Sequence, residues 1–339
     1  ASLRELVAAV AIRNGNAPWK LIVGYDEYVP GDWKRPEPSR KSMNVFFSFL
    51  DFGAENLCLD ALWFIPVSLR SHAIALVDGG WSRMFTRFLD IFLWGPRGVQ
   101  TAGIPLVLNG SPYLLKAQLE VCISDGMGLA QALEWRGAGS IKPCFFHCNV
   151  LKRNCRLSRE AGDEFVEIHC NDPTRFRRTE LHDLYDDVDS ILQLRHLVEA
   201  TPRMLDNMCY VTGIAATVHG LLASPNVRAN LDVRKVFHLD WAHTLLQDGT
   251  LTNDLSLFMR NAEHKLGIDA RFWESNLKDG WKFPSALHQK HRHLWKMFNE
   301  YRIPEGAETH VKGSMTEILG MYSLVRHIVE TTAAFNDPT

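Results

Sequence analysis

The sequence lacks any apolar run of about 18 residues or more, the length that a membrane-spanning helix requires, and no signal peptide is recognisable. It also lacks an excess of charge of either sign: 37 Lys and Arg face 39 Asp and Glu, and the net charge is −2. This balance excludes a protein coated in positive charge, so contact with nucleic acid would depend on local basic patches. No internal repeat or low-complexity segment is present. We therefore expect no membrane partner.

Cysteine is scarce and odd in number, with seven residues scattered through the chain. This usage does not suit a disulfide framework and favours a reducing, intracellular compartment. The 46% hydrophobic and 22% charged fractions are those of an ordinary globular protein, and 339 residues allow more than one packed unit. Because the sequence starts with Ala1 rather than Met, we expect a truncated N-terminus.

Three aspartates each follow an apolar run, namely Asp26 after 21–25, Asp125 after 119–124 and Asp240 after 236–239. A strand fixes its last residue in space, so carboxylates at strand ends can be aimed at one point. Two such charges about 4 Å apart repel by roughly 4 kcal/mol at an effective dielectric near 20, and a divalent cation is the usual remedy. The pattern predicts a metal site. The alternatives are a strand-end turn residue for Asp26 and helix N-caps for Asp125 and Asp240.

The order of the expected elements defines a fold. Apolar runs and turn signals predict an antiparallel meander of three strands, a helix, a hairpin with an Asn109-Gly110 turn, a helix and a further strand. Their expected bounds are 19–25, 43–52, 62–69, 79–94, 104–108 with 113–123, 127–135 and 141–150. This order is that of the α/β ribonuclease-H-like fold, a mixed sheet with acids on its first and fourth strands and on a later helix. A mixed α/β domain with coincidental aspartates is the alternative.

The expected domain organisation follows from changes in composition along the chain. Residues 151–235 are rich in polar loops and helical segments, which indicates a mostly helical insertion, and the part after Asp240 is also largely helical in pattern. The expected parts are an N-terminal helix and linker at 1–18, a ribonuclease-H-like core at 19–150, the insertion at 151–235 and a helical C-terminal part at 236–339.

Several blocks resemble those of CACTA-type and Plavaka-like DDE/D transposases and of related transposon-derived proteins of dinoflagellates. The blocks are Tyr25-Asp26-Glu27, Cys122-Ile-Ser-Asp125, Lys142-Pro-Cys144 with His147-Cys148, and Leu239-Asp240-Trp-Ala-His243. The resemblance implies a nuclear enzyme that cleaves transposon ends and transfers strands to target DNA, working as a homo-oligomer. It also implies two Mg²⁺ or Mn²⁺ ions held by the three aspartates. A catalytically inactive, domesticated DNA- or protein-binding module is the alternative.

The neighbours of the aspartates have their own expected roles. His243 lies three residues after Asp240 on one helical face, so the resemblance implies that it orients a ligand or contacts the scissile phosphate, while a packed histidine is equally compatible. Glu27 follows Asp26 on the opposite face of an extended chain and is expected to point away from the site.

Soft ligands gather after the second aspartate, which raises the question of zinc. The candidate ligands are Cys144, His147, Cys148 and Cys170, with Cys155 and His169 between them. Related transposases carry a Cys-x-x-Cys pair where this chain has Cys144-x-x-His147, and buried cysteines without metal are the alternative.

Basic residues form four short patches, which are 34–41, 152–159, 175–178 and 290–296. The first lies in the loop that leaves Asp26, so Lys34, Arg35, Arg40 and Lys41 are the expected DNA contacts. A solvated surface without a ligand is the alternative for each patch.

Overall fold

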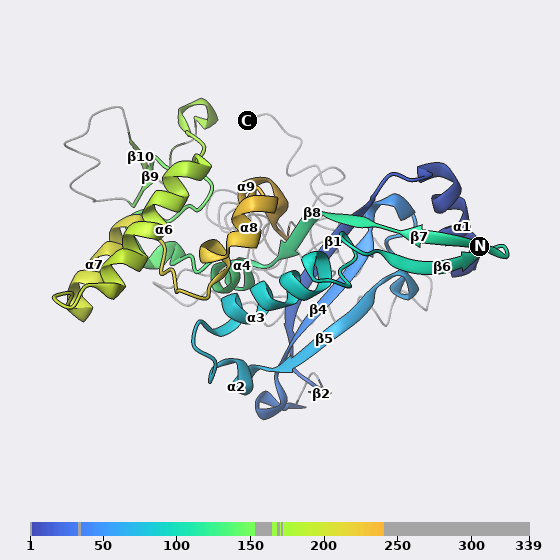
Figure 1. Ribbon diagram of the computed structural model, residues 1–339. Helices are drawn as coiled ribbons and strands as arrows, with labels where there is room; N and C mark the ends of the chain where they lie inside the picture. Colours follow the sequence, from blue (N-terminus) through green and yellow to red (C-terminus); the bar gives the residue numbers. More distant parts are fainter. Residues whose placement is uncertain (1, 33–34, 153–164, 168–169, 171, 241–339) are drawn as a thin grey trace, which may run out of the picture. The chain divides into compact units, whose positions relative to one another are not determined.

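The computed structural model describes residues 2–32, 35–152, 165–167, 170 and 172–240 (Figure 1). The chain divides into two compact units, Ala1–His238 and Leu239–Thr339. Only Leu239 and Asp240 of the second unit are described, so the fold below is that of the first unit. Its described helices include none that is both long and apolar enough to cross a membrane.

The first unit is mixed α/β, as expected. Its strands are β1 (Trp19–Tyr28), β2 (Gly31–Asp32), β3 (Arg35–Pro36), β4 (Ser42–Phe49), β5 (Phe64–Arg70), β6 (Ile104–Leu108), β7 (Ser111–Leu115), β8 (Ala117–Ser124), β9 (Val150–Leu151), β10 (Val166–Glu167) and β11 (Phe237–Leu239). Its α-helices are α1 (Leu3–Asn14), α2 (Ser71–Ile74), α3 (Gly80–Leu89), α4 (Gly126–Ala132), α6 (Leu181–His196), α7 (Pro202–Thr212), α8 (Pro225–Asn230) and α9 (Val233–Val236). Short 3₁₀ turns lie at Pro38–Arg40, Leu50–Phe52, Asp60–Leu62, Gly137–Gly139, Pro173–Arg175 and Leu221–Ala223, and a π-helical turn at Asp90–Trp94.

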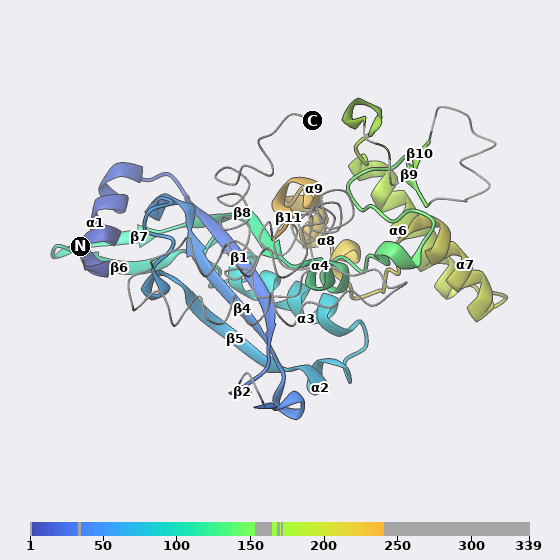
Figure 2. The same ribbon diagram turned by 180° about the vertical axis from the view of Figure 1, so that it is seen from behind.

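The main sheet has five strands in the order β11-β8-β1-β4-β5. The β1–β4 and β4–β5 pairs are antiparallel, which confirms the predicted meander, while β8 runs parallel to β1. The long strands β1, β4, β5 and β8 lie side by side from either direction of view (Figure 2). A sheet of both parallel and antiparallel pairs results, with β1 at its centre.

Helix α3 covers one face of this sheet because β1 turns alternate apolar side chains toward it. The Tyr25 ring lies 5.4 Å from Trp81 and 4.6 Å from Phe85, measured between centroids, and all three residues are buried. Ser82 of the same helix donates to the carbonyl of Ala132 in α4 (2.7 Å) and accepts from the amide of Leu221 (2.8 Å). One buried hydroxyl thus connects three segments far apart in sequence.

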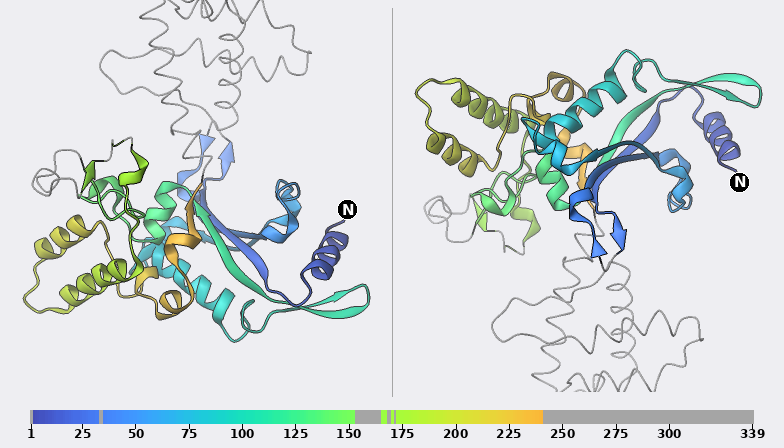
Figure 3. Two further views of the ribbon diagram at one scale, coloured as in Figure 1. Left: turned by 90° about the horizontal axis from the view of Figure 1, so that it is seen from above. Right: turned by 90° about the horizontal axis from the view of Figure 1, so that it is seen from below.

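The hairpin β6–β7 forms a separate two-stranded ribbon that extends beyond the neighbouring ends of β1 and β8 (Figure 3). Its turn residues Asn109 and Gly110 both have positive φ angles, 51° and 83°. This confirms the predicted type I′ turn, in which both central residues adopt the left-handed conformation.

The expected strand at 141–150 is wrong: the strand that forms, β9, covers only Val150 and Leu151 and pairs with β10, and His147 makes an isolated bridge with Arg178. The backbone groups of this segment bond to other parts of the chain instead. The Ile141 amide donates to the Tyr210 carbonyl (3.0 Å), and the Cys148 amide donates to the Arg177 carbonyl (3.0 Å). Helices α6 and α7 follow side by side, away from the main sheet (Figure 3), where the sequence predicts helices.

Candidate acidic site

Asp26 lies within β1, two residues before its end, rather than at the end of the strand. It is exposed and pairs with Asn44 of β4 in the antiparallel register. One of its carboxylate oxygens accepts from the Glu27 amide at 2.7 Å. Glu27 instead accepts from Lys41 (2.9 Å) and from the hydroxyl of Ser71 (2.7 Å). The Lys41 contact is the main reason that the pKa of Glu27 is lowered.

Asp125 directly follows β8 and caps the N-terminus of α4. Its Oδ1 accepts from the Gly128 amide at 2.5 Å, which satisfies one of the amides that a helix start leaves unpaired. The Tyr25 hydroxyl donates to the Gly128 carbonyl at 3.1 Å. A Cβ at position 128 would lie 2.0 Å from the Ser124 hydroxyl oxygen, so glycine lets the first turn of α4 lie this close to the end of β8.

A β-bulge sets the relation between these two strands. Leu21 pairs with Leu119, but Ile22 pairs with Val121, so Glu120 is the extra residue on β8. The burial pattern changes with it: Ala117 and Leu119 are buried before the bulge, and Cys122 and Ser124 after it. A bulge shifts every later side chain to the other face.

After the bulge, Gly24 pairs with Ile123, a separation of 123 − 24 = 99 residues. Asp26 and Asp125 have the same separation, 125 − 26 = 99, so each lies two residues beyond this pair. The Ser124 hydroxyl donates to the Tyr25 carbonyl at 3.1 Å, which keeps the two chains adjacent one residue before the aspartates. Neighbouring strands are about 4.8 Å apart. The two aspartates are therefore level on adjacent parallel chains.

Asp240 directly follows β11, the strand next to β8 in the main sheet. It belongs to the second unit, so its position relative to the other aspartates is not described. His243 lies outside the described residues. Within the described ranges, no three His, Cys, Asp or Glu side chains are grouped so that they could hold a metal ion.

The expected zinc ligands lie in separate contacts. The Cys144 sulfur is 3.2 Å from Nδ1 of His147. Cys148 contacts the Arg177 carbonyl (3.5 Å), and Cys170 contacts the Asp172 carbonyl (3.8 Å). Cys155 and His169 lie outside the described residues.

Cys144 and His147 are both favoured in their neutral forms. Burial raises the pKa of the Cys144 thiol. Burial, and then the nearby charge of Arg178, lowers the pKa of His147. A thiolate–imidazolium pair, the activated form that nucleophilic cysteines use, is therefore disfavoured here.

The expected DNA contacts near Asp26 are largely engaged with acids. Arg40 pairs with Glu37 (3.1 Å) and Lys41 with Glu27 (2.9 Å), and all four side chains are exposed. Arg35 lies in β3, and Lys34 lies outside the described residues. These ion pairs offset the charge on which the expected contact with phosphate depended.

Glu134 is a buried acid that the sequence does not single out. Its Oε1 accepts from the Thr217 hydroxyl (2.6 Å) and amide (3.1 Å), whereas Oε2 is inaccessible and has no partner among the described residues. Burial raises its pKa to about 7. Its φ of 52° is uncommon for a residue with a side chain. No local pattern announces this conformation, which depends on contacts with residues 215–217.

A scan against models of protein families finds no match to this sequence, and neither does a search of curated proteins.

Proposed function

We propose that this chain is a ribonuclease-H-like DDE/D transposase that cleaves DNA and transfers strands with the help of divalent metal ions. The observation that carries the proposal is the main sheet, in which an antiparallel β5-β4-β1 meander is extended by β8, parallel to β1, and then by β11. Asp26 lies on the first of these strands in chain order, and Asp125 follows the fourth. The ribonuclease-H-like fold expected from the sequence has its first two acids in the same places, on the first and fourth strands.

The donors fit the proposed metal in chemical type. Carboxylate oxygens are ligands that Mg²⁺ and Mn²⁺ prefer, and Asp26 and Asp125 each lie two residues beyond the paired Gly24 and Ile123 on adjacent strands. Asp240 joins the proposal because it directly follows β11, and His243 because it follows Asp240. The fit concerns donor type and strand position and not a preformed cage, since the described side chains include no three-ligand group. When bound, two such ions activate the attacking oxygen and stabilise the leaving one.

The chain's own contribution in this proposal is positioning. The Tyr25 contact with the Gly128 carbonyl and the Ser124 contact with the Tyr25 carbonyl hold β1, β8 and α4 in one arrangement. Burial raises the pKa of the Tyr25 phenol well above its usual value, so the hydroxyl stays protonated and remains a donor. Fixed placement of the carboxylates lowers the entropic cost of bringing reactants together.

A plasmid-nicking assay tests the proposal. Wild-type protein should nick supercoiled DNA with Mg²⁺ or Mn²⁺, and Asp125→Asn should reduce the rate by a factor of about a thousand or more, since an amide is a poor metal ligand. Asparagine also caps helices well, so the fold should be retained. Asp60→Asn, which removes the charge of an exposed aspartate in a separate 3₁₀ turn, is the matched control. Equal rates for Asp125→Asn and the control would refute the assignment.

One observation favours the second candidate, a binding module without turnover. The Asp125 carboxylate is already used as a helix cap, a structural role that needs no metal. In this reading the wild-type protein binds DNA or a protein partner but nicks no DNA with either metal. The same assay, performed beside a binding measurement, separates the two functions.

A further inference from the structure

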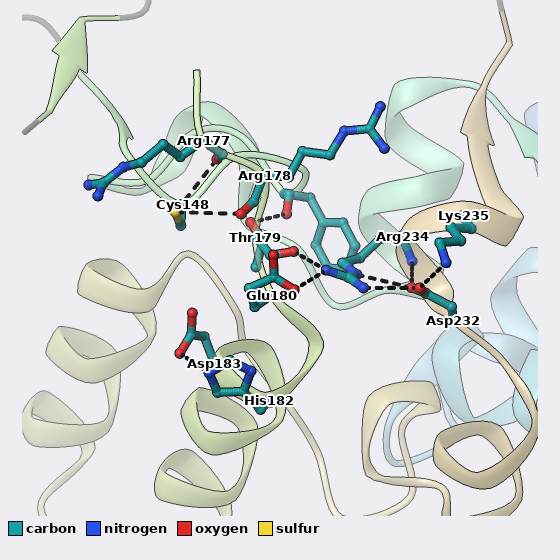
Figure 4. A network of polar contacts seen from close by, with 11 residues as sticks. Cys148, Arg177, Arg178, Thr179, Glu180, His182, Asp183, Asp232, Arg234 and Lys235 are labelled. Carbon is teal, nitrogen blue, oxygen red and sulfur yellow. Dashed lines mark hydrogen bonds and ion pairs between the residues drawn. The ribbon is translucent and has the colours of Figure 1, made fainter. Parts of the chain in front are cut away.

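Arg234 lies on the short helix α9, directly before β11, and its guanidinium group joins the start of α6 to the start of α9 (Figure 4). Nη1 donates to the Thr179 carbonyl (2.6 Å) and to Oε2 of Glu180 (3.0 Å), the N-cap residue of α6. Nε and Nη2 donate to the two carboxylate oxygens of Asp232 (3.0 Å each), the N-cap residue of α9. Every nitrogen of this guanidinium group is therefore engaged.

We propose that Arg234 is a positioning residue: it fixes the path by which the chain enters β11, and so the place of the Asp240 carboxylate that follows this strand. The inference rests on the proposed function, in which Asp240 is a metal ligand. Arg234 acts through the strand and touches neither the metal nor the DNA. Its loss should therefore weaken metal binding without removing a ligand.

The first support is that β11 is short, so its position depends on the residues before it. It has three residues, and among the described strands it pairs only with β8. A pairing of this length supplies few ladder hydrogen bonds. Phe237 adds a buried contact, with its ring centroid 6.3 Å from that of Phe85 in α3, but apolar contacts are non-directional. The residues that lead into β11 must therefore set its direction.

The second support is that the Arg234 contacts are directional and partly shielded from water. A paired contact between a guanidinium group and a carboxylate has a fixed geometry as well as a favourable energy. The side chains of Arg234 and Asp232 are both 20% exposed, so salt screens this pair less than it screens pairs at the surface. The hydrogen bond from Arg234 is the main reason that the pKa of Asp232 is lowered, which keeps this carboxylate ionised.

The third support is that the other end of the link is itself fixed. Thr179 is buried, its amide donates to the Phe146 carbonyl (3.0 Å), and its hydroxyl donates to the Phe145 carbonyl (3.1 Å). The helix that follows, α6, has 16 residues and buries Leu184, Val188 and Ile191. Arg234 thus ties the entry to β11 to a packed helix, and the link can transmit a defined position.

The test compares two arginines that make the same kinds of contact. Arg228, on α8, also binds one aspartate through two bonds (Asp189, 2.7 and 3.0 Å) and one backbone carbonyl (Leu222, 2.7 Å), and its side chain is 24% exposed. Each arginine is replaced by lysine, which keeps the charge but cannot make the paired bonds. Mn²⁺ binding by the full chain is measured by electron paramagnetic resonance of the free ion, under conditions in which urea unfolding shows both variants to be folded.

Arg234→Lys should weaken Mn²⁺ binding about tenfold or more, the size of effect seen when a residue that orients a metal ligand is lost. Arg228→Lys should keep the wild-type affinity. In the plasmid-nicking assay, Arg234→Lys should raise the Mn²⁺ concentration that gives half of the maximal rate by the same factor. A loss of folded protein alone would lower the maximal rate and leave this concentration unchanged.

Equal Mn²⁺ affinities for the two lysine variants would overturn the proposal, as would a wild-type protein that binds no Mn²⁺. Asp232→Asn, which keeps the helix cap but weakens the paired contact, covers the case in which Arg234→Lys does not fold. Its Mn²⁺ affinity should also fall, and a wild-type affinity would count against Arg234. Nicking by the wild type with equal affinities for the lysine variants refutes the role of Arg234 alone. Mn²⁺ binding that depends on Arg234, without nicking, refutes only the catalytic function.

Discussion

The buried carboxylate of Glu134 should make the stability of this protein depend on pH between about 4.5 and 7. In the unfolded chain a glutamate has its ordinary pKa of 4.5, whereas burial in the folded protein raises the pKa to about 7. The two Thr217 hydrogen bonds and the charge of Arg195 act against this rise, and the charge of Asp78 adds to it. The folded protein therefore binds the proton more tightly than the unfolded chain.

The sign of the effect follows from this difference. The stabilisation by the bound proton is fully present below about pH 4.5 and is lost as the pH rises through 7. A difference of one between the folded and unfolded pKa values corresponds to about 1.4 kcal/mol of stability. The difference between about 7 and 4.5 therefore gives a whole change on the order of 3 kcal/mol. Glu134→Gln keeps the shape and an oxygen that accepts from Thr217, but it does not titrate. The free energy of unfolding of the wild type, relative to this variant, should fall by that amount.

The measurement is urea unfolding, followed by tryptophan fluorescence, at intervals from pH 4.5 to 8. Glu199→Gln, which removes an exposed carboxylate, is the control and should track the wild type. A wild-type minus Glu134→Gln difference that stays constant across the range to within about 0.5 kcal/mol would refute the reasoning. It would mean that the Glu134 side chain leaves its buried position at little cost when it ionises.

Two further predictions concern packing and ion pairing. Gly24→Ala should lower the free energy of unfolding by about 1–3 kcal/mol, because the new Cβ would lie 2.0 Å from the Phe46 ring, and adding Phe46→Leu should recover part of the loss in thermal unfolding. Arg228→Lys should cost about 1–2 kcal/mol, since Arg228 binds Asp189 through two bonds (2.7 and 3.0 Å) and lies 4.7 Å above the Tyr185 ring. A double-mutant cycle with Asp189→Asn checks it, and a coupling near zero would contradict it.

The sequence was sufficient where a local rule decides the structure. Apolar runs and turn signals predicted the β1-β4-β5 meander, and Asn109-Gly110 predicted the turn of the β6–β7 hairpin because both residues tolerate positive φ. The helix-cap alternative for Asp125 is confirmed by its 2.5 Å contact with the Gly128 amide. Each of these features depends on a few neighbouring residues, which is why it could be read without tertiary information.

The remainder depends on distant contacts. The apolar run at 141–150 has the composition of a buried strand, but its backbone bonds to Arg177, Thr179 and Tyr210, so Phe145 is buried without a strand around it. Likewise, the burial of Glu134 depends on Thr217, 83 residues later. The ion pair between Lys41 and Glu27 spans 14 residues, and it changes how a basic patch is interpreted.

The bulge at Glu120 decides which face of the sheet the second aspartate, Asp125, can share with the first, Asp26. Before the bulge the offset between β1 and β8 is 119 − 21 = 98 residues, and after it the offset is 99. With the earlier offset, Asp26 would be level with Ser124, and Asp125 would be level with Glu27, on the opposite face of β1. A single extra residue, invisible in the alternating pattern of β8, therefore brings Asp26 and Asp125 level. The acidic site is thus a property of strand register, which apolar runs and spacing alone do not determine.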